Sequence, residues 1–556
     1  MTLRSEEVLR RPLGSSKRVL FKSMGFTDNE LNGPIIGVAN AWSTLVSGHF
    51  NLRNVADRVR SGIAGAGGMA VEFGVPGICD GIAENHRGAH FVLPSRDLIA
   101  NSIEVMAEAH ALDGIVLLGS CDKIVPAMLM AATRVDLPAI MVVGGPAEGG
   151  SEVDGRSLDS TTVDEALPML ESGQMDETEF SALEDSSQPT CGSCAFLGTA
   201  NSMCCAAEAL GLSLPGTATI PAVHSARLQM ARLAGERIVG LVNENLSARK
   251  IVNRASLENA IRTMAAIGAS TNTVLHLMAI AYETGVELSV DDFERLWRST
   301  PQVARMNPAA PATVPDFHRA GGIPAVMKQI LPLLNPDSVT VTGHTISENT
   351  AGAAIRDNAI IRPLGNPWNR EGGLAVLRGN LAPDSGITKP AAIHPSMHLF
   401  TGIAMCFDTE EDATRAIMGG RVTDGTVVVI RYEGPCGGPG MPEMYAPMKY
   451  LHGRGLALKT ALVTDGRFSG TNNGCFVGHV SPEAAKGGPI AVVQDGDRIT
   501  IDVPARRLHL HVSDDDLKRR LEAWVRPEPK IRNGYLSIYA RLTDSAEKGA
   551  MIRHRQ

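Results

Sequence analysis

Continuous apolar segments that alternate with helical segments limit the possible folds of this sequence more than any other feature. Between about residues 35 and 300, the runs GPIIGVAN, DGIVLLGS and PAIMVVGG are almost entirely apolar, so each predicts a strand that is buried on both faces. The segments between them, LRNVADRVRSGIAGAGG and PAMLMAATRV, have the periodicity of helices. A parallel sheet with helices on both faces satisfies this pattern, and the predicted fold class is therefore α/β.

The second part of the chain has a different pattern. Short β-rich runs, in GTVVVIRYEG, GPIAVVQDGDRITIDV and RRLHLHV, are separated by Gly and Asp-Gly turns, which predicts a β-barrel-like α/β domain. Pro and Gly are frequent between about residues 300 and 370, as expected of a domain boundary. Since 556 residues exceed the usual size of one core, we predict an N-terminal domain over 1–355 and a C-terminal domain over 356–556.

Composition excludes several classes of partner. The formal net charge of -8 argues against a nucleic-acid or anionic-membrane surface. No segment approaches the ~20 apolar residues of a membrane span, and the start MTLRSEEVLRRPL lacks the apolar core of a signal peptide. We therefore predict a cytoplasmic protein without a membrane or nucleic-acid partner. Its nine cysteines are expected to be reduced and mostly buried.

A thiol, a carboxylate and an amine stand side by side directly after the predicted strand DGIVLLGS, as Cys121, Asp122 and Lys123. Ligands of open α/β sheets bind outside the carboxyl ends of the strands. The soft thiolate of Cys121 favours iron or an iron–sulfur cluster, whereas the hard carboxylate of Asp122 favours Mg²⁺ or Mn²⁺. From these residues alone, a core cysteine followed by a solvated Asp-Lys pair is an equal alternative.

The sequence contains a single C-x-x-C motif, formed by Cys191 and Cys194 within QPTCGSCAF. Such a motif fits a redox dithiol, half of a zinc site or a set of cluster ligands. A structural zinc site is disfavoured because the chain has no second C-x-x-C. With Cys121 as a third thiolate, the motif also fits a three-cysteine cluster with one open iron. The preceding segment DETEFSALEDSSQ is expected to be an acidic loop.

Carboxylates and a serine stand in other Gly-rich segments. Asp80, in GICDGIAENHRGAH, is either a second hard-metal ligand or a turn-forming Asp before Gly. Glu433 and Glu443 lie in a loop dense in Gly and Pro, where a carboxylate either completes a metal site or belongs to a rigid turn. Ser469 follows the strand-like ALVTDG segment without a G-x-S-x-G elbow or an obvious base, so it would need a nearby metal or Lewis acid to be useful.

Taken together, these segments resemble the dihydroxy-acid dehydratase family, which also contains aldonic (sugar) acid and phosphogluconate dehydratases. The resemblance extends in order over about 450 residues and rests on nine segments. They are NAW…GHFNLR, CDGIA, LPSRDLIANS, CDKIVPAMLMA, PTCGSCAFLGTANSM, GASTNTVLHLMAIA, GGLAVLRGNLAPD, VIRYEGPCGGPGMPEM and TDGRFSG…GHVSPEAA.

The resemblance implies a role for each candidate residue. Cys121 and Cys194 match cysteines that ligate an iron–sulfur cluster. Three carboxylates match Mg²⁺ ligands, and a lysine carbamylated on its amine adds a further ligand; these are Asp80, Asp122, Glu443 and Lys123. Ser469 matches the serine that removes the C2 proton as an alkoxide. The implied reaction converts a small 2,3-dihydroxy carboxylic acid to a 2-keto acid, in a homodimer or homotetramer.

The cluster type depends on departures from the family pattern. Members with a [2Fe–2S] cluster have a cysteine where this chain has Gly48. The chain is more similar to members with Gly-His at that point and a complete C-x-x-C, so we expect [4Fe–4S] rather than [2Fe–2S]. Cys191 is then the expected third thiolate, with Cys79 as the alternative.

The substrate expected first is of the 2,3-dihydroxyisovalerate type, as in branched-chain amino-acid biosynthesis. An aldonic acid of sugar catabolism is the alternative, because both branches share every catalytic residue. An iron–sulfur redox protein is a third possibility. The hard-ligand set of Asp80, Asp122, Lys123 and Glu443 argues against it, since electron transfer does not need these residues.

Overall fold

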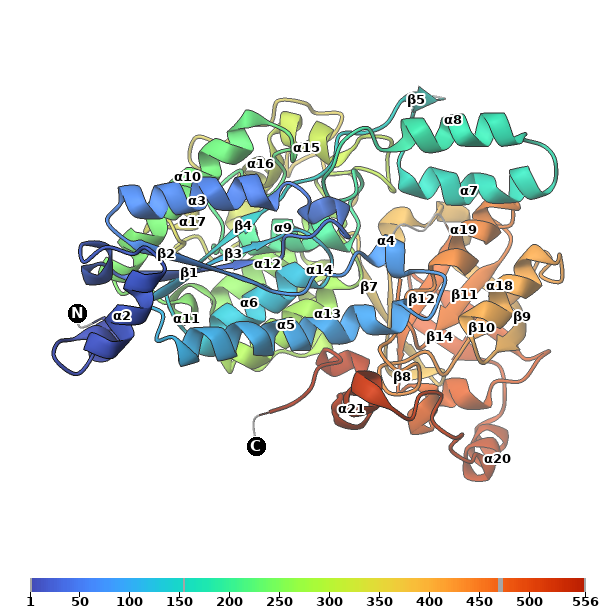
Figure 1. Cartoon of the computed structure of the whole chain (residues 1–556). Coiled ribbons are helices and arrows are strands. Elements are labelled where there is room, and N and C mark those ends of the chain that lie inside the picture. The colour runs from blue at the N-terminus through green and yellow to red at the C-terminus, as the bar shows by residue number, and fades with distance from the viewer. Residues whose placement is uncertain (1–2, 154–155, 469–473, 555–556) are drawn as a thin grey trace.

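The computed structural model describes residues 3–153, 156–468 and 474–554. Its N-terminal region is built on an open parallel sheet, and its C-terminal region is built on a closed barrel of eight strands (Figure 1). The predicted α/β class with a barrel-like second region is therefore confirmed.

The N-terminal sheet has four parallel strands in the order β2-β1-β3-β4. Their bounds are β1 Ile35–Asn40, β2 Met69–Gly74, β3 Gly114–Gly119 and β4 Ala139–Val143. Every residue of β1, β3 and β4 is buried, which agrees with the unbroken apolar runs of the sequence. Because the strands are parallel, the residues that follow β1 and β3 emerge at the same edge of the sheet.

Helices cover both faces of this sheet. In Figure 1, α3 (Leu52–Gly65) and α10 (Ser225–Asn243) lie on one face, and α5 (Ala89–Ala109), α6 (Ile124–Val135) and α13 (Thr273–Thr284) lie on the other. The remaining helices of this region include α1 Arg4–Leu9, α2 Ser15–Ser23, α9 Thr199–Ala209, α11 Ala248–Ile251, α12 Arg254–Ile267, α14 Val290–Arg298, α15 Val314–Ala320, α16 Gly322–Ile330 and α17 Ile346–Thr350.

The barrel mixes parallel and antiparallel pairs in the order β10-β11-β12-β8-β7-β14-β13-β9. Its strands are β7 Ala375–Gly379, β8 Ala382–Thr388, β9 Leu399–Phe407, β10 Thr426–Ile430, β11 Ala461–Thr464, β12 Cys475–Ser481, β13 Arg498–Asp502 and β14 Arg507–Leu510. Its main helices are α18 Glu410–Met418, α19 Tyr445–Gly453, α20 Asp514–Ala523 and α21 Gly534–Leu542. The central parallel strands β10 and β11 point their carboxyl ends at the loops that carry Glu443 and Arg467.

Two segments differ from their predicted structure. The expected acidic loop is largely the helix α8 (Glu177–Ser187), because Asp176 caps it by accepting hydrogen bonds from the amides of Thr178 and Glu179. The apolar run before Asp497 is a short 3₁₀ turn, Pro489–Val492, instead of a strand. Pro489 has no amide hydrogen for a β-ladder, and its fixed φ favours the first position of such a turn.

Helix α8 and α7 (Ser160–Glu171) form a hairpin that is joined to the rest of the chain through α19 (Figure 1). The hydroxyl of Tyr445 donates to Asp164 at 2.7 Å. One turn later, the amine of Lys449 forms a buried ion pair with Glu165 at 2.9 Å. The helix that follows Glu443 is thereby fixed to a segment nearly 300 residues earlier in the chain.

The predicted boundary at residue 355 falls after α17 and before β7. The exact division into 1–355 and 356–556 stays a prediction. Among the described helices, none combines the length and the apolar composition that crossing a bilayer requires.

Candidate active site

The loops that follow β3, β10 and β11 meet between the sheet and the barrel. Asp122 and Lys123 come directly after β3, where Lys123 is the N-cap residue of α6. Asp80 begins the one-turn helix α4 (Asp80–Ala83). Glu443 comes from the Gly- and Pro-rich loop before α19 and pairs as an isolated bridge with Arg467, which follows β11. Both halves of the chain therefore contribute to one site, at the edge where ligands of parallel sheets bind.

Three carboxylates predicted as metal ligands lie together. One oxygen each of Asp80, Asp122 and Glu443 falls within 4.8 Å of the others. The amine of Lys123 lies among them, at 2.6 Å from Asp80 and 3.3 Å from both Asp122 and Glu443. Since Lys123, Asp80 and Glu443 are all buried, these charges interact with little screening by water.

Burial and mutual charge shift the pKa values of this group. Burial, with the neighbouring Asp122, raises the pKa of Asp80 to about 7. Burial and Arg467 oppose the charged form of Lys123, but the three carboxylates outweigh them and raise its pKa. Burial opposes the charged form of Glu443 as well, yet Arg467 and Lys123 lower its pKa overall. The two cations of the site, Lys123 and Arg467, are therefore too few to keep all of its carboxylates fully ionised.

Two side chains that the sequence analysis missed hold Glu443 in place. The guanidinium of Arg467 donates to the Glu443 carboxylate and, at 2.6 Å, to the carbonyl of Met441. The amide of Asn272, at the start of α13, donates to the same carboxylate at 2.7 Å. Arg467 stands two residues before Ser469, and Asn272 stands in the GASTNTV segment, so both lay within motifs already identified.

The residues fit a divalent cation. Oδ1 of Asp80 is buried and has no hydrogen-bond partner among the described residues, although it faces a cluster of acidic groups. A buried acceptor of this kind needs a cation or a donor. Carboxylate oxygens are the ligands that Mg²⁺ prefers.

The buried thiol of Cys121 adjoins the carboxylates, and the thiols of Cys79 and Cys194 are half-buried. Cys121 directly precedes Asp122, and burial raises the pKa of its thiol, with further contributions from Cys79, Asp122 and Cys194. Burial likewise raises the pKa of Cys194, and Asp122 and Cys79 add to this shift. The thiols of Cys79, Cys121 and Cys194 come from three separate segments and are near enough to shift pKa values among themselves. This donor set fits a soft metal centre, since metal binding is what would favour the thiolate form there.

Cys79, the alternative to the predicted Cys191, acts electrostatically on both Cys121 and Cys194. Cys79 immediately precedes Asp80, and burial raises the pKa of its thiol to about 11. Gly48 lies on the other side of Cys121, where an added Cβ would come within 2.7 Å of the Cys121 sulfur. The backbone at Gly48 therefore packs against this thiol without offering one of its own. Cys191 as a ligand stays a prediction.

Ser469 and Glu433 are the remaining candidate residues of the sequence. Ser469 lies outside the described residues; Phe468, just before it, accepts a hydrogen bond from the Thr271 hydroxyl, beside Asn272. Glu433 does not join the carboxylate group: it pairs with Lys530 at 2.8 Å and accepts from the amide of Glu410 at the start of α18. Of the two glutamates in the Gly- and Pro-rich loop, Glu443 alone belongs to the metal-ligand set.

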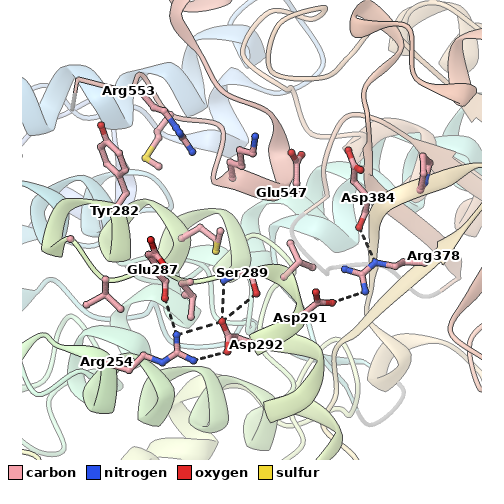
Figure 2. A pocket seen from close by; sticks show the side chains of 18 residues that line it. Arg254, Tyr282, Glu287, Ser289, Asp291, Asp292, Arg378, Asp384, Glu547 and Arg553 are labelled. Carbon is pink, nitrogen blue, oxygen red and sulfur yellow. Dashed lines mark hydrogen bonds and ion pairs between the residues drawn. The ribbon is translucent and has the colours of Figure 1, made fainter. Parts of the chain in front are cut away.

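A cavity of about 1120 Å³ lies elsewhere in the described structure. It is lined by the adjoining ends of α13 and α14, by the β7–β8 hairpin and by residues 547–553, and none of the predicted site residues lines it. Figure 2 shows Arg254 paired with Asp292 and Arg378 paired with Asp291. These arginines are engaged with neighbouring carboxylates, so the cavity offers no chemistry comparable to the carboxylate and thiol groups.

Comparison with known proteins agrees with this geometry. Residues 33–349 match the N-terminal family model of dihydroxy-acid/6-phosphogluconate dehydratases, and residues 359–550 match the C-terminal model. The chain is 47% identical over 553 residues to a dihydroxy-acid dehydratase of Caldanaerobacter subterraneus, covering 99% of each chain. It is 47% identical over 555 residues to that of Acetivibrio thermocellus (100% of each chain) and 49% identical over 537 residues to that of Carboxydothermus hydrogenoformans (96% and 97%). The chain therefore belongs to the dihydroxy-acid/6-phosphogluconate dehydratase family.

Proposed function

We propose that the protein is a hydro-lyase that converts 2,3-dihydroxy carboxylic acids of the 2,3-dihydroxyisovalerate type to 2-keto acids. The observation that carries the proposal is the juxtaposition of two unlike donor sets. Asp80, Asp122 and Glu443 offer oxygen atoms within 4.8 Å of one another, directly beside the thiols of Cys121 and its neighbours. One hard and one soft metal group at a single site suit a substrate with adjacent oxygen functions.

The proposal assigns the metal groups to named residues. Asp80, Asp122, Glu443 and modified Lys123 would hold Mg²⁺. Cys121 and Cys194 would hold an iron–sulfur cluster, [4Fe–4S] rather than [2Fe–2S], with Cys191 from the sequence or Cys79 from its electrostatic neighbours as the third ligand. When bound, these groups supply Lewis-acid stabilisation of negative charge on the substrate oxygens and on the departing hydroxyl.

The chain's own residues supply the base and the orientation. Ser469, as an alkoxide, would remove the proton from C2. The electron pair of the broken C2–H bond forms the C2=C3 double bond, and the 3-hydroxyl leaves with the C3–O pair and takes up one proton as water. The enol then becomes the 2-keto acid by moving its hydroxyl proton to C3. Arg467 and Asn272 keep Glu443 in its position through their hydrogen bonds.

Modification of Lys123 resolves a conflict of charge. An ammonium among three carboxylates competes directly with a divalent cation for the same oxygens. If the amine loses a proton and attacks CO₂, an N–C bond forms, one C=O pair moves to oxygen and a second proton leaves nitrogen. The product is a carbamate with one negative charge, which turns the competing cation into a further oxygen ligand.

Product formation tests the proposal. Anaerobically purified protein with Mg²⁺ is offered 2,3-dihydroxyisovalerate, arabinonate, xylonate and gluconate, and 2-keto acid is measured. Preference for 2,3-dihydroxyisovalerate is the expected result. Preference for an aldonate would assign the same chemistry to sugar acids. No product from any substrate, with the cluster absorption intact, would contradict the proposal.

We further propose a cytoplasmic enzyme that assembles as a homodimer or homotetramer. All nine cysteines are free, which suits a reducing compartment. Light scattering on the purified protein would give the mass directly, and a mass of one chain would contradict the assembly.

A further inference from the structure

His479 is a buried side chain that the chemistry above does not use. It is 1% exposed, and neither of its ring nitrogens has a hydrogen-bond partner among the described residues. Burial and, to a smaller extent, the charge of Arg467 lower the pKa of His479 to about 3, so the imidazole is neutral at pH 7. A neutral imidazole carries one N–H donor and one acceptor, and leaving both unused inside a protein costs free energy.

The backbone at His479 adopts an uncommon, strained conformation. His479 has φ of 53°, a left-handed conformation that is uncommon for residues other than glycine. The pairing of β12 with β8 shifts register between Gly478 and Ser481, so His479 lies in an irregular stretch of the strand. Such irregularities re-aim side chains next to active sites, and the strain they store persists at functional positions.

Three charged groups act on the pKa of His479. They are those of Arg467, Glu443 and Lys123, all members of the carboxylate site. The backbone amide of His479 also donates to the carbonyl of Gly466 at 2.8 Å, next to Arg467. His479 is therefore linked, through Gly466 and the adjoining Arg467, to the buried group that contains Lys123 and Glu443.

A second buried histidine has spare hydrogen-bonding capacity at the same place. His276, on α13, is fully buried, and its Nδ1 accepts from the guanidinium of Arg96 at 3.3 Å. Because a guanidinium only donates, the proton of the neutral ring is on Nε2, which has no partner among the described residues. Burial lowers the pKa of His276, and Arg96, Lys123, Arg467 and His479 contribute to this shift. His276 is linked to the carboxylate group through Asn272, one turn earlier, which donates to Glu443, and His479 is linked to it through Gly466 and Arg467.

The unmodified amine of Lys123 makes no demand on these rings, because the three carboxylates accept from it. A carbamate on Lys123 would need hydrogen-bond donors, since it brings two acceptor oxygens into the buried site. Any such oxygen that does not bind the metal needs a donor. Arg467 is already engaged with Glu443 and with the carbonyl of Met441, whereas the imidazole N–H groups have no acceptor within the described part of the chain.

We propose that His479, together with His276, is a positioning residue that donates hydrogen bonds to the carbamate formed on Lys123. This inference rests on the proposed function, because it needs the modified lysine. The two histidines would stabilise the carbamate and thereby raise the affinity of the site for its metal.

The test measures the carbamate itself. Anaerobic holoenzyme with Mg²⁺ is equilibrated with ¹³C-bicarbonate, and the lysine carbamate is detected by ¹³C NMR, with Lys123→Met to identify the signal. His479→Leu should raise the half-saturating bicarbonate concentration about tenfold, the size expected for loss of a supporting partner. His479→Asn is the matched control, because Asn keeps an N–H donor and tolerates a positive φ. It should stay within about twofold of the wild type.

A folded His479→Leu protein with wild-type carbamate affinity would overturn the proposal. If that variant does not fold, His276→Leu decides in the same way, since it removes the neighbouring donor: unchanged affinity overturns the proposal, and a loss supports it. A wild-type enzyme that forms 2-keto acid without any carbamate signal would overturn this inference while leaving the dehydratase assignment intact. Absence of turnover would contradict the proposed function instead.

Discussion

Lys123 shows how strongly neighbours determine the chemistry of a residue at this site. Its amine is within 3.3 Å of three carboxylates, and these raise its pKa although burial alone would lower it. The same surroundings raise the pKa of Asp80 to about 7. Binding of a divalent cation must therefore ionise Asp80 and displace the proton of Lys123. Metal affinity should rise with pH through about 7, where Asp80 ionises, and continue to rise above it because the pKa of Lys123 is raised.

Replacement of the proposed base separates catalysis from metal binding. Ser469→Ala should reduce turnover roughly 100- to 10,000-fold, the contribution typical of a positioned base. The visible absorption of the cluster should stay at the wild-type level, because a serine in this role is not a cluster ligand. Near-normal 2-keto acid formation by Ser469→Ala would remove this serine from the mechanism.

Iron content distinguishes the two candidates for the third thiolate. Cys79 acts electrostatically on both Cys121 and Cys194, so Cys79→Ser should lower the iron bound per chain. The C-x-x-C motif predicts the same loss for Cys191→Ser. Anaerobic reconstitution followed by iron and sulfide analysis of both variants makes the comparison. Full iron content in Cys79→Ser would restore Cys191 as the ligand.

The candidate metal ligands could be predicted from the sequence more readily than the side chains that hold them in place. Asp80, Asp122, Lys123 and Glu443 stand in recognisable motifs, and the structure brings their side chains together. Asn272, His276 and His479 were missed because each lies in a segment with an ordinary helical or strand pattern. Their significance depends on contacts with distant residues, such as the bond from Asn272 to Glu443, 171 residues away.

At the scale of elements, α19 connects the site to the α7–α8 hairpin. Glu443 precedes α19 directly, and the buried Lys449–Glu165 pair joins this helix to α7. We therefore expect motion of the hairpin to be coupled to the loop that carries Glu443, a proposed metal ligand.

Breaking this ion pair should loosen the hairpin. Lys449→Met removes the cation that pairs with the buried Glu165, at a cost of about 3–5 kcal/mol, as for other buried pairs broken on one side. Hydrogen exchange should then be faster in α7 and α19 than in the parallel sheet. Arg232→Met, which breaks the exposed pair with Glu236, is the matched control and should cost less than about 1 kcal/mol. Unchanged exchange in α7 would show that the pair does not hold the hairpin.

Local signals explain which elements were predictable. Strands β1, β3 and β4 could be predicted because a strand that is buried on both faces is almost entirely apolar, and such a run is easily recognised. The hairpin was missed because its acidic composition hid the cap at Asp176, whose partner Glu179 lies three residues later. The 3₁₀ turn at Pro489–Val492 was taken for a strand because its apolar character outweighed the proline.

For the whole molecule, the site exists only where the two regions meet. Lys123 lies 43 residues from Asp80 but 320 residues from Glu443 in the sequence. Spacing along the chain cannot predict such a contact, and the fold class alone does not place the barrel against the sheet. The resemblance to dehydratases supplied what periodicity and spacing could not.

The two glutamates of the Gly- and Pro-rich loop provide the most direct test of the central claim, that the carboxylate group is the reaction centre. Both are buried and stand ten residues apart, but Glu443 belongs to that group and Glu433 pairs with Lys530 instead. The measurement is 2-keto acid formation from 2,3-dihydroxyisovalerate by the wild type, Glu443→Gln and Glu433→Gln, each with its iron content and far-UV circular dichroism matched. Glu443→Gln should lose more than the roughly 10- to 100-fold that removal of a supporting residue costs, whereas Glu433→Gln should keep most of its activity. Equal activity of Glu443→Gln and the wild type would contradict the account.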